Sequence, residues 1–183
     1  MTENESGTEA SEYTKRASNL FYIGRYAEAL ELFDRAIALD PRITRAHSGR
    51  GITLAQLGLP QDGYDAAQRA LALEPGFANA YCVAGLCLHR MGKLEDAAAA
   101  YARAIDLASD DARVLYNYAC FWAELRDEEK CREYLTRAFR HVDYEAIDHS
   151  REDPDLARYV DTDWFREVLA NAKIGRQKKH KDD

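Results

Sequence analysis

Small and apolar side chains recur along this chain at a fixed interval of 34 residues. The recurring positions are Gly24, Gly58 and Gly92, then Ala36, Ala70, Ala104 and Ala138, then Leu39, Leu73 and Leu107, and finally Pro41 and Pro75. In the fourth copy Arg126 stands at the glycine position. A fixed period of this length is typical of proteins built from stacked structural repeats. The pattern therefore predicts about four copies of one unit.

Each copy is predicted to contain two helices that flank a short turn. Apolar residues recur at helical spacing on both sides of the glycine, as in Tyr81, Ala84, Gly85, Leu88 and then Ala97, Tyr101, Ala104, Ile105. A glycine just past a helix end adopts the left-handed conformation at low steric cost, so the chain reverses there. Pro41 and Pro75 close the second helix because their rings interrupt the helical hydrogen bonds. Small residues such as Gly51, Gly85, Ala70 and Ala104 are expected at close helix crossings.

These segments resemble a known repeat family. GRYAEALELFDRAIALDP (Gly24 to Pro41) and GKLEDAAAAYARAIDLA (Gly92 to Ala108) are similar to the second half of the tetratricopeptide repeat of bacterial proteins. The resemblance implies an all-α, right-handed solenoid of helical hairpins. The four repeats are expected over residues 10–43, 44–77, 78–111 and 112–142, between a disordered tail at 1–9 and a C-terminal helical cap.

The cap is expected over residues 143–173, followed by a basic disordered tail at 174–183. AIDHSREDPDLARYV and DTDWFREVLA resemble the segment that closes many bacterial repeats of this type. Such a cap needs an apolar inner face under a polar outer one. The residues that supply this inner face are Leu156, Tyr159, Val160, Trp164, Phe165, Val168 and Leu169.

Two copies depart from the family pattern. Copy two has Pro60, Gly63 and Ala67 where tyrosine, alanine and an aromatic residue are common, so we expect a less tightly packed hairpin there. Copy four has Ala119 and Arg126 in place of glycines and Cys131 in place of alanine, which puts its turn in question.

Charge and composition restrict the class of protein. The net charge is -7, and residues 10–142 carry only -1 of it, so the body is nearly neutral. Binding to nucleic acid by neutralising phosphates requires a basic body, which disfavours nucleic acid as a partner. The basic tail leaves it as a weaker alternative. No uncharged apolar run is long enough to span a membrane, and no secretory leader is evident, so a cytoplasmic location is expected.

The chain shows no recognisable catalytic or cofactor motif. Its five histidines lie in different segments without triad partners or zinc-ligand spacing, and His141 and His149 with nearby acids make at most a stray cation site. The glycines form no phosphate-binding loop. Its four cysteines lack CxxC spacing and are expected to be reduced and buried, although a disulfide between Cys120 and Cys131 is conceivable. We therefore expect a non-enzymatic protein without cofactor or metal.

The resemblance also nominates a binding surface. In stacked hairpins the first helices line a concave groove, which binds another protein. The family's groove offsets place there Ser18, Phe21, Tyr22, Arg45, Ser48, Ile52, Gln56, Asn79, Cys82, Leu86, His89, Arg90, Arg113, Tyr116, Asn117, Cys120 and Glu124. Three arginines stand against one glutamate in this set, so an extended or helical peptide with acidic character is the expected partner.

Two alternatives bear on the groove. A subclass of the family grips a terminal carboxylate of chaperones with lysines, asparagines and an arginine, and this chain has Thr14, Ser18, Gly49 and Val83 at those positions. A chaperone-tail clamp is therefore not expected. The other alternative is a homo-oligomer in which the acidic segment 143–167 of one copy meets the mildly basic groove of another.

Overall fold

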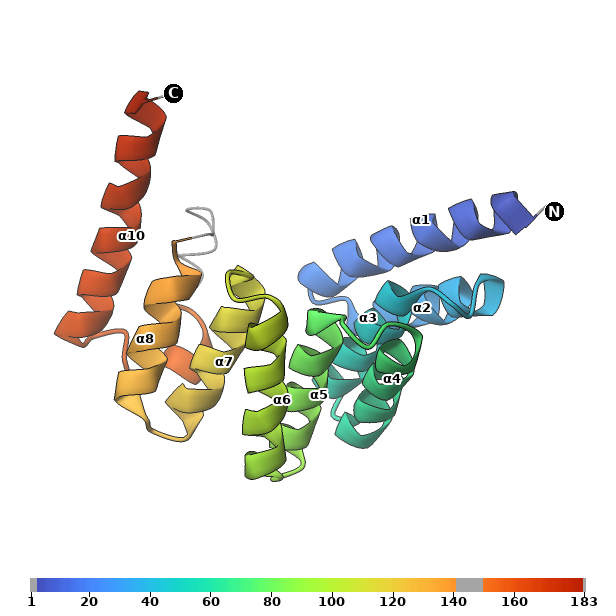
Figure 1. Ribbon diagram of the computed structural model, residues 1–183, viewed down its shortest axis with the longest axis horizontal. Coiled ribbons are helices and arrows are strands. Elements are labelled where there is room, and N and C mark those ends of the chain that lie inside the picture. Colours follow the sequence, from blue (N-terminus) through green and yellow to red (C-terminus); the bar gives the residue numbers. More distant parts are fainter. Residues whose placement is uncertain (1–2, 141–149, 183) are drawn as a thin grey trace. The chain divides into compact units, whose positions relative to one another are not determined.

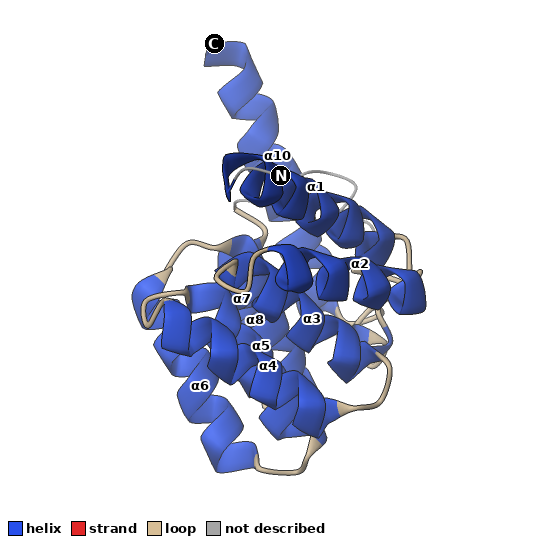
Figure 2. Cartoon of the chain, turned by 90° about the vertical axis from the view of Figure 1, so that its right-hand side faces the viewer, coloured by secondary structure: helices blue, strands red, loops and turns tan. Residues whose placement is uncertain are grey.

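The computed structural model describes the backbone of residues 3–140 and 150–182 and the side chains of residues 6–140 and 150–172. Within these ranges the chain forms nine α-helices and one 3-10 helix and contains no strand (Figure 2). This confirms the all-α prediction. The residues group into two compact units, Met1–Leu107 and Ala108–Asp183.

Unit 1 consists of three helical hairpins packed in succession. The helices are α1 (Glu3–Tyr22), α2 (Tyr26–Leu39), α3 (Thr44–Gln56), α4 (Pro60–Leu73), α5 (Ala78–Arg90) and α6 (Leu94–Leu107) (Figure 1). Each odd-numbered helix pairs with the helix that follows it, and α3 also contacts α1 and α5. The first helices of the three hairpins therefore lie side by side, as expected for a helical solenoid.

Unit 2 holds the fourth hairpin and the C-terminal segment. Its elements are α7 (Ala112–Glu124), α8 (Glu128–Ala138), the 3-10 helix η1 (Pro154–Leu156) and α10 (Asp163–Asp182). The helix α10 packs on α8, and η1 packs on α7. Six of the seven residues predicted for the inner face of the cap are buried, and the seventh, Val160, is half-buried.

The four turns inside the hairpins share one backbone geometry. Gly24, Gly58, Gly92 and Arg126 all have positive φ angles, of 77°, 79°, 76° and 63°. The residue after each of them donates its N–H to the carbonyl five residues earlier, as Lys93 does to Leu88 at 2.9 Å. This bond closes a Schellman motif, which satisfies carbonyls at the helix end. Arg126 adopts the glycine conformation despite its Cβ, so the fourth turn is conserved in shape although its residue differs.

The hairpin formed by α3 and α4 is closely packed, contrary to the expectation for copy two. A Cβ atom on Gly51 would lie 2.8 Å from the carbonyl oxygen of Gly63, and one on Gly63 would lie 2.6 Å from the carbonyl oxygen of Gly51. The two helix backbones therefore touch where neither residue has a side chain. The prediction of a loose hairpin was wrong because Gly63 replaces side-chain packing with direct backbone contact.

Both predicted tails differ from the structure. The helix α1 begins at Glu3, and Ser6 in its first turns donates a hydrogen bond to the carbonyl of Leu39 at 3.0 Å. At the other end, α10 continues to Asp182 through the segment expected to be a disordered basic tail. The first residues of α3, α5 and α7 coincide with the predicted starts of repeats two, three and four.

Candidate functional site

Unit 1 brings twelve of the predicted groove residues onto three adjacent helices. We call them the first-helix face: Ser18, Phe21 and Tyr22 of α1; Arg45, Ser48, Ile52 and Gln56 of α3; Asn79, Cys82, Leu86, His89 and Arg90 of α5. Tyr22, Arg45, Gln56 and Arg90 are exposed, whereas Ser48 and Cys82 are buried. The remaining six are half-buried. The surface that this face can offer a ligand therefore comes mainly from the exposed and half-buried members.

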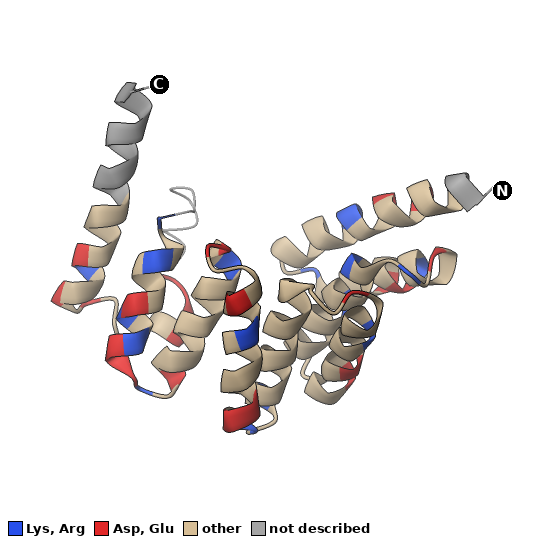
Figure 3. Cartoon of the chain, in the orientation of Figure 1, with Lys and Arg blue, Asp and Glu red and all other residues tan. Residues whose placement is uncertain are grey.

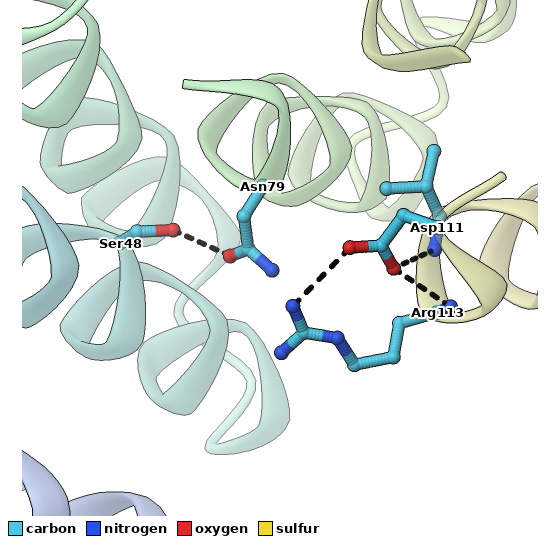
Figure 4. Close-up of polar contacts among 5 residues, drawn as sticks. Ser48, Asn79, Asp111 and Arg113 are labelled. Atoms are coloured by element: carbon cyan, nitrogen blue, oxygen red, sulfur yellow. Dashed lines mark hydrogen bonds and ion pairs between the residues drawn. The ribbon is translucent and has the colours of Figure 1, made fainter. Parts of the chain in front are cut away.

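A polar pair joins α3 to α5 near the N-terminal ends of both helices. The Ser48 hydroxyl donates a hydrogen bond to Oδ1 of Asn79 at 2.8 Å (Figure 4). Ser48 is 1% exposed, so its hydroxyl is satisfied by this bond rather than by water. The bond also fixes the orientation of the Asn79 amide. Because Oδ1 accepts from Ser48, the amide nitrogen is left on the other side of the group as a donor.

A second polar contact joins the C-terminal ends of the same helices. The Arg90 guanidinium donates to the main-chain carbonyl of Ala55 and, at 2.8 Å, to Oε1 of Gln56. Both acceptors lie in the last turn of α3, where carbonyl groups lack partners within the helix. A cation there also interacts favourably with the helix dipole. Arg90 therefore holds one repeat to the next, a role that its position in the predicted groove did not reveal.

Apolar side chains lie between these two polar contacts. Ile52 and Leu86 are half-buried and pack against the cluster formed by Ala55, Ala67, Val83, Ala84 and Cys87. At the α1 end, the Phe21 ring contacts Tyr22 and Tyr26 at centroid distances of 5.8 and 5.3 Å. Tyr22 is 69% exposed, so it presents an aromatic surface to solvent. The first-helix face thus combines an apolar centre with polar ends.

The charge on this face has one sign. Arg45 and Arg90 are exposed and His89 is half-buried, while none of the twelve residues is acidic. An arginine presents several N–H donors in a planar fork that suits a carboxylate. The formal charge of the twelve residues is therefore positive.

The positions that would carry a carboxylate clamp are partly buried in this chain. Thr14 is 8% exposed and donates to the carbonyl of Ala10, and Val83 is 1% exposed. Gly49 faces Phe33, whose Cζ would lie 2.3 Å from an added Cβ. A lysine at Thr14, an asparagine at Gly49 or an arginine at Val83 would therefore require repacking of unit 1.

Unit 2 places the remaining five groove candidates on α7. Arg113 and Glu124 are exposed, Tyr116 and Asn117 are half-buried, and Cys120 is buried. Asp111 caps α7 by accepting hydrogen bonds from the main-chain N–H groups of Arg113 and Val114, at 2.9 and 3.3 Å (Figure 4). The Arg113 guanidinium lies 3.4 Å from the other Asp111 oxygen. Arg113 is therefore engaged with the cap of its own helix.

The closing segment covers part of α7. The Tyr116 hydroxyl donates a hydrogen bond to Oδ2 of Asp153 at 2.6 Å, although 37 residues separate the two in sequence. Oδ1 of Asp153 accepts the main-chain N–H of Asp155 at 2.9 Å. Burial, reinforced by Cys120 and Asp153 nearby, raises the pKa of the Tyr116 phenol, so the hydroxyl stays protonated as a donor. Two groove candidates, Tyr116 and Cys120, thus lie against residues of the closing segment of their own chain.

Cys120 lies in a small acidic cluster with the same segment. Its Sγ and single carboxylate oxygens of Asp153 and Asp155 lie within 4.8 Å of one another. Such a group resembles a cation site, but both Asp153 oxygens already accept hydrogen bonds. Burial, together with the two aspartates, raises the pKa of the Cys120 thiol. Hydrogen bonds from Tyr116 and from the Asp155 N–H thus hold the Asp153 carboxylate in this cluster.

The other cysteines are also poorly suited to nucleophilic chemistry. All four are buried, and none of them forms a disulfide, so Cys120 and Cys131 are not bonded to each other. Burial raises the pKa of Cys87 to about 12, against the opposing effect of Arg90, and the pKa of Cys131 to about 12. A thiol with so high a pKa holds almost no thiolate at neutral pH. His141 and His149, the residues of the stray cation site, lie outside the described residues.

Charged residues in unit 2 are concentrated on outward-facing positions. Figure 3 shows acidic and basic residues intermixed along α8. Arg132 on α8 and Glu167 on α10 form an ion pair at 3.1 Å, which helps to hold the cap in place. In the part of the chain that the structure describes, no helix has the length and hydropathy needed to cross a membrane.

Solved structures with this fold include several helical repeat proteins. A thermophilic protein of Thermus thermophilus is 20% identical, with 90% of this chain and 99% of that chain covered at a TM-score of 0.67. The first repeat domain of Spaghetti (RPAP3), bound to the HSP90 peptide SRMEEVD, is 20% identical, with 66% and 95% covered at a TM-score of 0.57. YrrB, described as having an unusual peptide-binding site, is 18% identical, with 87% and 82% covered at a TM-score of 0.50. At such identities the likeness concerns the fold.

A search of curated proteins found no match. The model of the tetratricopeptide repeat family matches residues 14–76, 54–112 and 82–140, and thus covers more than half of the sequence. The same residues form the helical hairpins described above. The chain therefore belongs to the tetratricopeptide repeat family.

Proposed function

We propose that this protein is a non-enzymatic interaction module that binds an acidic peptide segment of another protein on the first-helix face of unit 1. The observation that carries the proposal is the composition of that face. Exposed Arg45 and Arg90 accompany half-buried Ile52 and Leu86, and no acidic residue belongs to the set. Apolar contact supplies affinity, while arginines select carboxylates.

The amides on the face suit an extended main chain. Asn79 has its oxygen turned to Ser48, which leaves its N–H groups for a peptide carbonyl. Neighbours of the same fold bind peptides: the first and second repeat domains of Spaghetti hold the HSP90 peptide SRMEEVD. Because Thr14, Gly49 and Val83 replace the lysine, asparagine and arginine of the clamp, a carboxyl-terminal clamp is not part of the proposal.

Capture from extract of the source cells, followed by binding measurements with the captured peptide, tests this proposal. Arg45→Glu should weaken binding at least tenfold, since it places a carboxylate against an acidic ligand. Arg69→Glu is the matched control, because Arg69 is an exposed arginine on α4, outside the face. Equal losses in both variants would indicate non-specific attraction and would contradict the proposed site.

Self-assembly is less well supported. The structure engages part of the acidic segment, Asp153, with Tyr116 of its own unit. Sedimentation over a concentration series at low and high salt tests it, and a salt-sensitive increase in mass would favour the homo-oligomer. Nucleic-acid binding through residues 174–183 is tested by deleting them. The cytoplasmic location remains a prediction from the sequence.

A further inference from the structure

The turn that precedes η1 covers a part of α7 that corresponds to the first-helix face. One repeat period of 34 residues relates Tyr116 to Cys82 and Cys120 to Leu86, both of which belong to that face. In unit 2 the corresponding positions lie next to Asp153 and Asp155 of the same chain. The chain therefore covers, on α7, positions that correspond to members of the first-helix face.

The covering segment has the chemistry of the proposed ligand. Residues 151–155 read Arg, Glu, Asp, Pro, Asp, so three of five side chains are acidic. The backbone of Asp153 is extended, with φ of -70° and ψ of 119°, before the single turn of η1 begins. Glu152 and Asp155 are exposed. An acidic stretch that is extended at Asp153 and then forms one 3-10 turn resembles a bound acidic peptide.

The segment lies between buried residues and is bonded to α7, and Ser150, just before it, is 1% exposed. Leu156 is 0% exposed and Tyr159 is 5% exposed, so the chain after the turn is fixed in the core of unit 2. The turn itself meets α7 through the hydroxyl of Tyr116 and the carboxylate of Asp153, 2.6 Å apart. One substitution removes this hydrogen bond to a charged group, which lowers the free energy needed to open the turn while Leu156 and Tyr159 stay buried.

We propose that residues 151–155 are an intramolecular occupant of α7, an acidic segment that must leave before a peptide can contact Tyr116. The contact is autoinhibitory and is broken by loss of the bond between Tyr116 and Asp153. The identity of the competing ligand rests on the proposed function, whereas the covering and opening of α7 do not.

The opening is tested without any peptide by following the reaction of Cys120 with N-ethylmaleimide in the full chain. Tyr116→Phe removes the hydroxyl but keeps the ring and every carboxylate, so a faster reaction reports uncovering of the thiol. We expect the labelling rate of Cys120 to rise roughly fivefold to tenfold. Glu152→Gln is the matched control, because it removes one acid of the same turn that makes no hydrogen bond to α7 among the described residues. Its rate should stay within about twofold of wild type.

Cys131 distinguishes local opening from unfolding of the unit. It is buried on α8 with 0% exposure, away from the turn in sequence. Faster labelling of Cys120 with Cys131 unchanged supports the proposal. An unchanged Cys120 rate in Tyr116→Phe overturns it, and so does a parallel rise at both thiols, because the turn is then an inseparable part of the core.

Competition is tested separately with the peptide SRMEEVD as an acidic probe. Asp153→Asn weakens the internal occupant and leaves Tyr116 intact, so the probe should bind several-fold more tightly than to wild type. Glu152→Gln again serves as control. Equal affinity in wild type and Asp153→Asn, or no binding to either, overturns the competition. Failure of the proposed function is recognised independently, by an Arg45→Glu variant that captures partners as well as wild type does.

Discussion

Gly51 and Gly63 face each other across the α3–α4 hairpin so closely that a Cβ on either would lie under 3.0 Å from the carbonyl oxygen of the other. Gly63→Ala should therefore lower the free energy of unfolding by about 1–3 kcal/mol, the usual range for overpacking. Urea denaturation followed by circular dichroism measures the change.

The control for this variant is Gly7→Ala in α1. An added Cβ at Gly7 would meet nothing within 4 Å, so only the higher helix propensity of alanine remains. Gly7→Ala should stabilise by up to about 1 kcal/mol. A Gly63→Ala protein as stable as wild type would contradict the close packing of the hairpin.

The turn between α7 and α8 provides a stabilising substitution. Arg126 has a φ of 63°, where a side chain costs about 1–2 kcal/mol. Arg126→Gly removes this cost and should raise the free energy of unfolding. The gain should be only about 0.5–1 kcal/mol, because the greater freedom of glycine in the unfolded chain offsets part of it. Gly92→Ala makes the opposite change at the matching turn of unit 1 and should destabilise. Thermal denaturation of the two variants should shift the midpoints in opposite directions.

Asp127 at the start of α8 gives a prediction about pH. Its carboxylate accepts the main-chain N–H of Lys130 at 3.1 Å, and this bond, with the Lys130 ammonium nearby, lowers the pKa of Asp127. A lowered pKa in the folded state stabilises the fold above the unfolded value of about 4, and the effect disappears as pH falls through the folded value.

Asp127→Ala should therefore cost about 1 kcal/mol at pH 7, as lost N-caps do. The difference in the free energy of unfolding between variant and wild type should become smaller as acid protonates the Asp127 carboxylate. Urea titrations at several pH values from 7 downward measure it. If this difference in free energy stayed constant into the acid range, an ionised Asp127 would not be the source of the stabilisation.

We expect the Arg90 side chain to stabilise the fold even when no peptide is bound. Arg90→Met removes the bonds to Ala55 and Gln56 and should cost about 1 kcal/mol, a modest value because the group is exposed. Arg45→Met is the comparison, since Arg45 is an exposed arginine of the same face with no hydrogen bond given by the structure; its unfolding midpoint should match wild type. Equal effects of the two substitutions would show that the Arg90 side chain does not hold α5 to α3.

The sequence was sufficient for the helices and their turns because these depend on local signals. The starts of α3, α5 and α7, the turn glycines and the apolar face of the cap all follow from spacing, from glycine conformation and from burial. Copy two was misjudged because a comparison of side chains does not show that Gly51 and Gly63 allow direct backbone contact.

The candidate site was predicted less completely. Groove offsets located the first-helix face but gave no indication that Ser48 and Cys82 would be buried or that Arg90 would cap α3. The contact between Tyr116 and Asp153 joins residues 37 positions apart across a segment without periodicity. Such a contact is decided by how the chain returns after α8, and no local pattern in a single sequence encodes it.

The aromatic core of unit 2 has a practical consequence for spectroscopy. The chain has two tryptophans, Trp122 on α7 and Trp164 on α10, and both belong to this unit. Indole emission therefore reports melting of Ala108–Asp183 alone, while far-ultraviolet ellipticity sums the helices of both units. Midpoints that coincide by the two signals would mean that the units melt as one cooperative body, and separate midpoints would assign a stability to each.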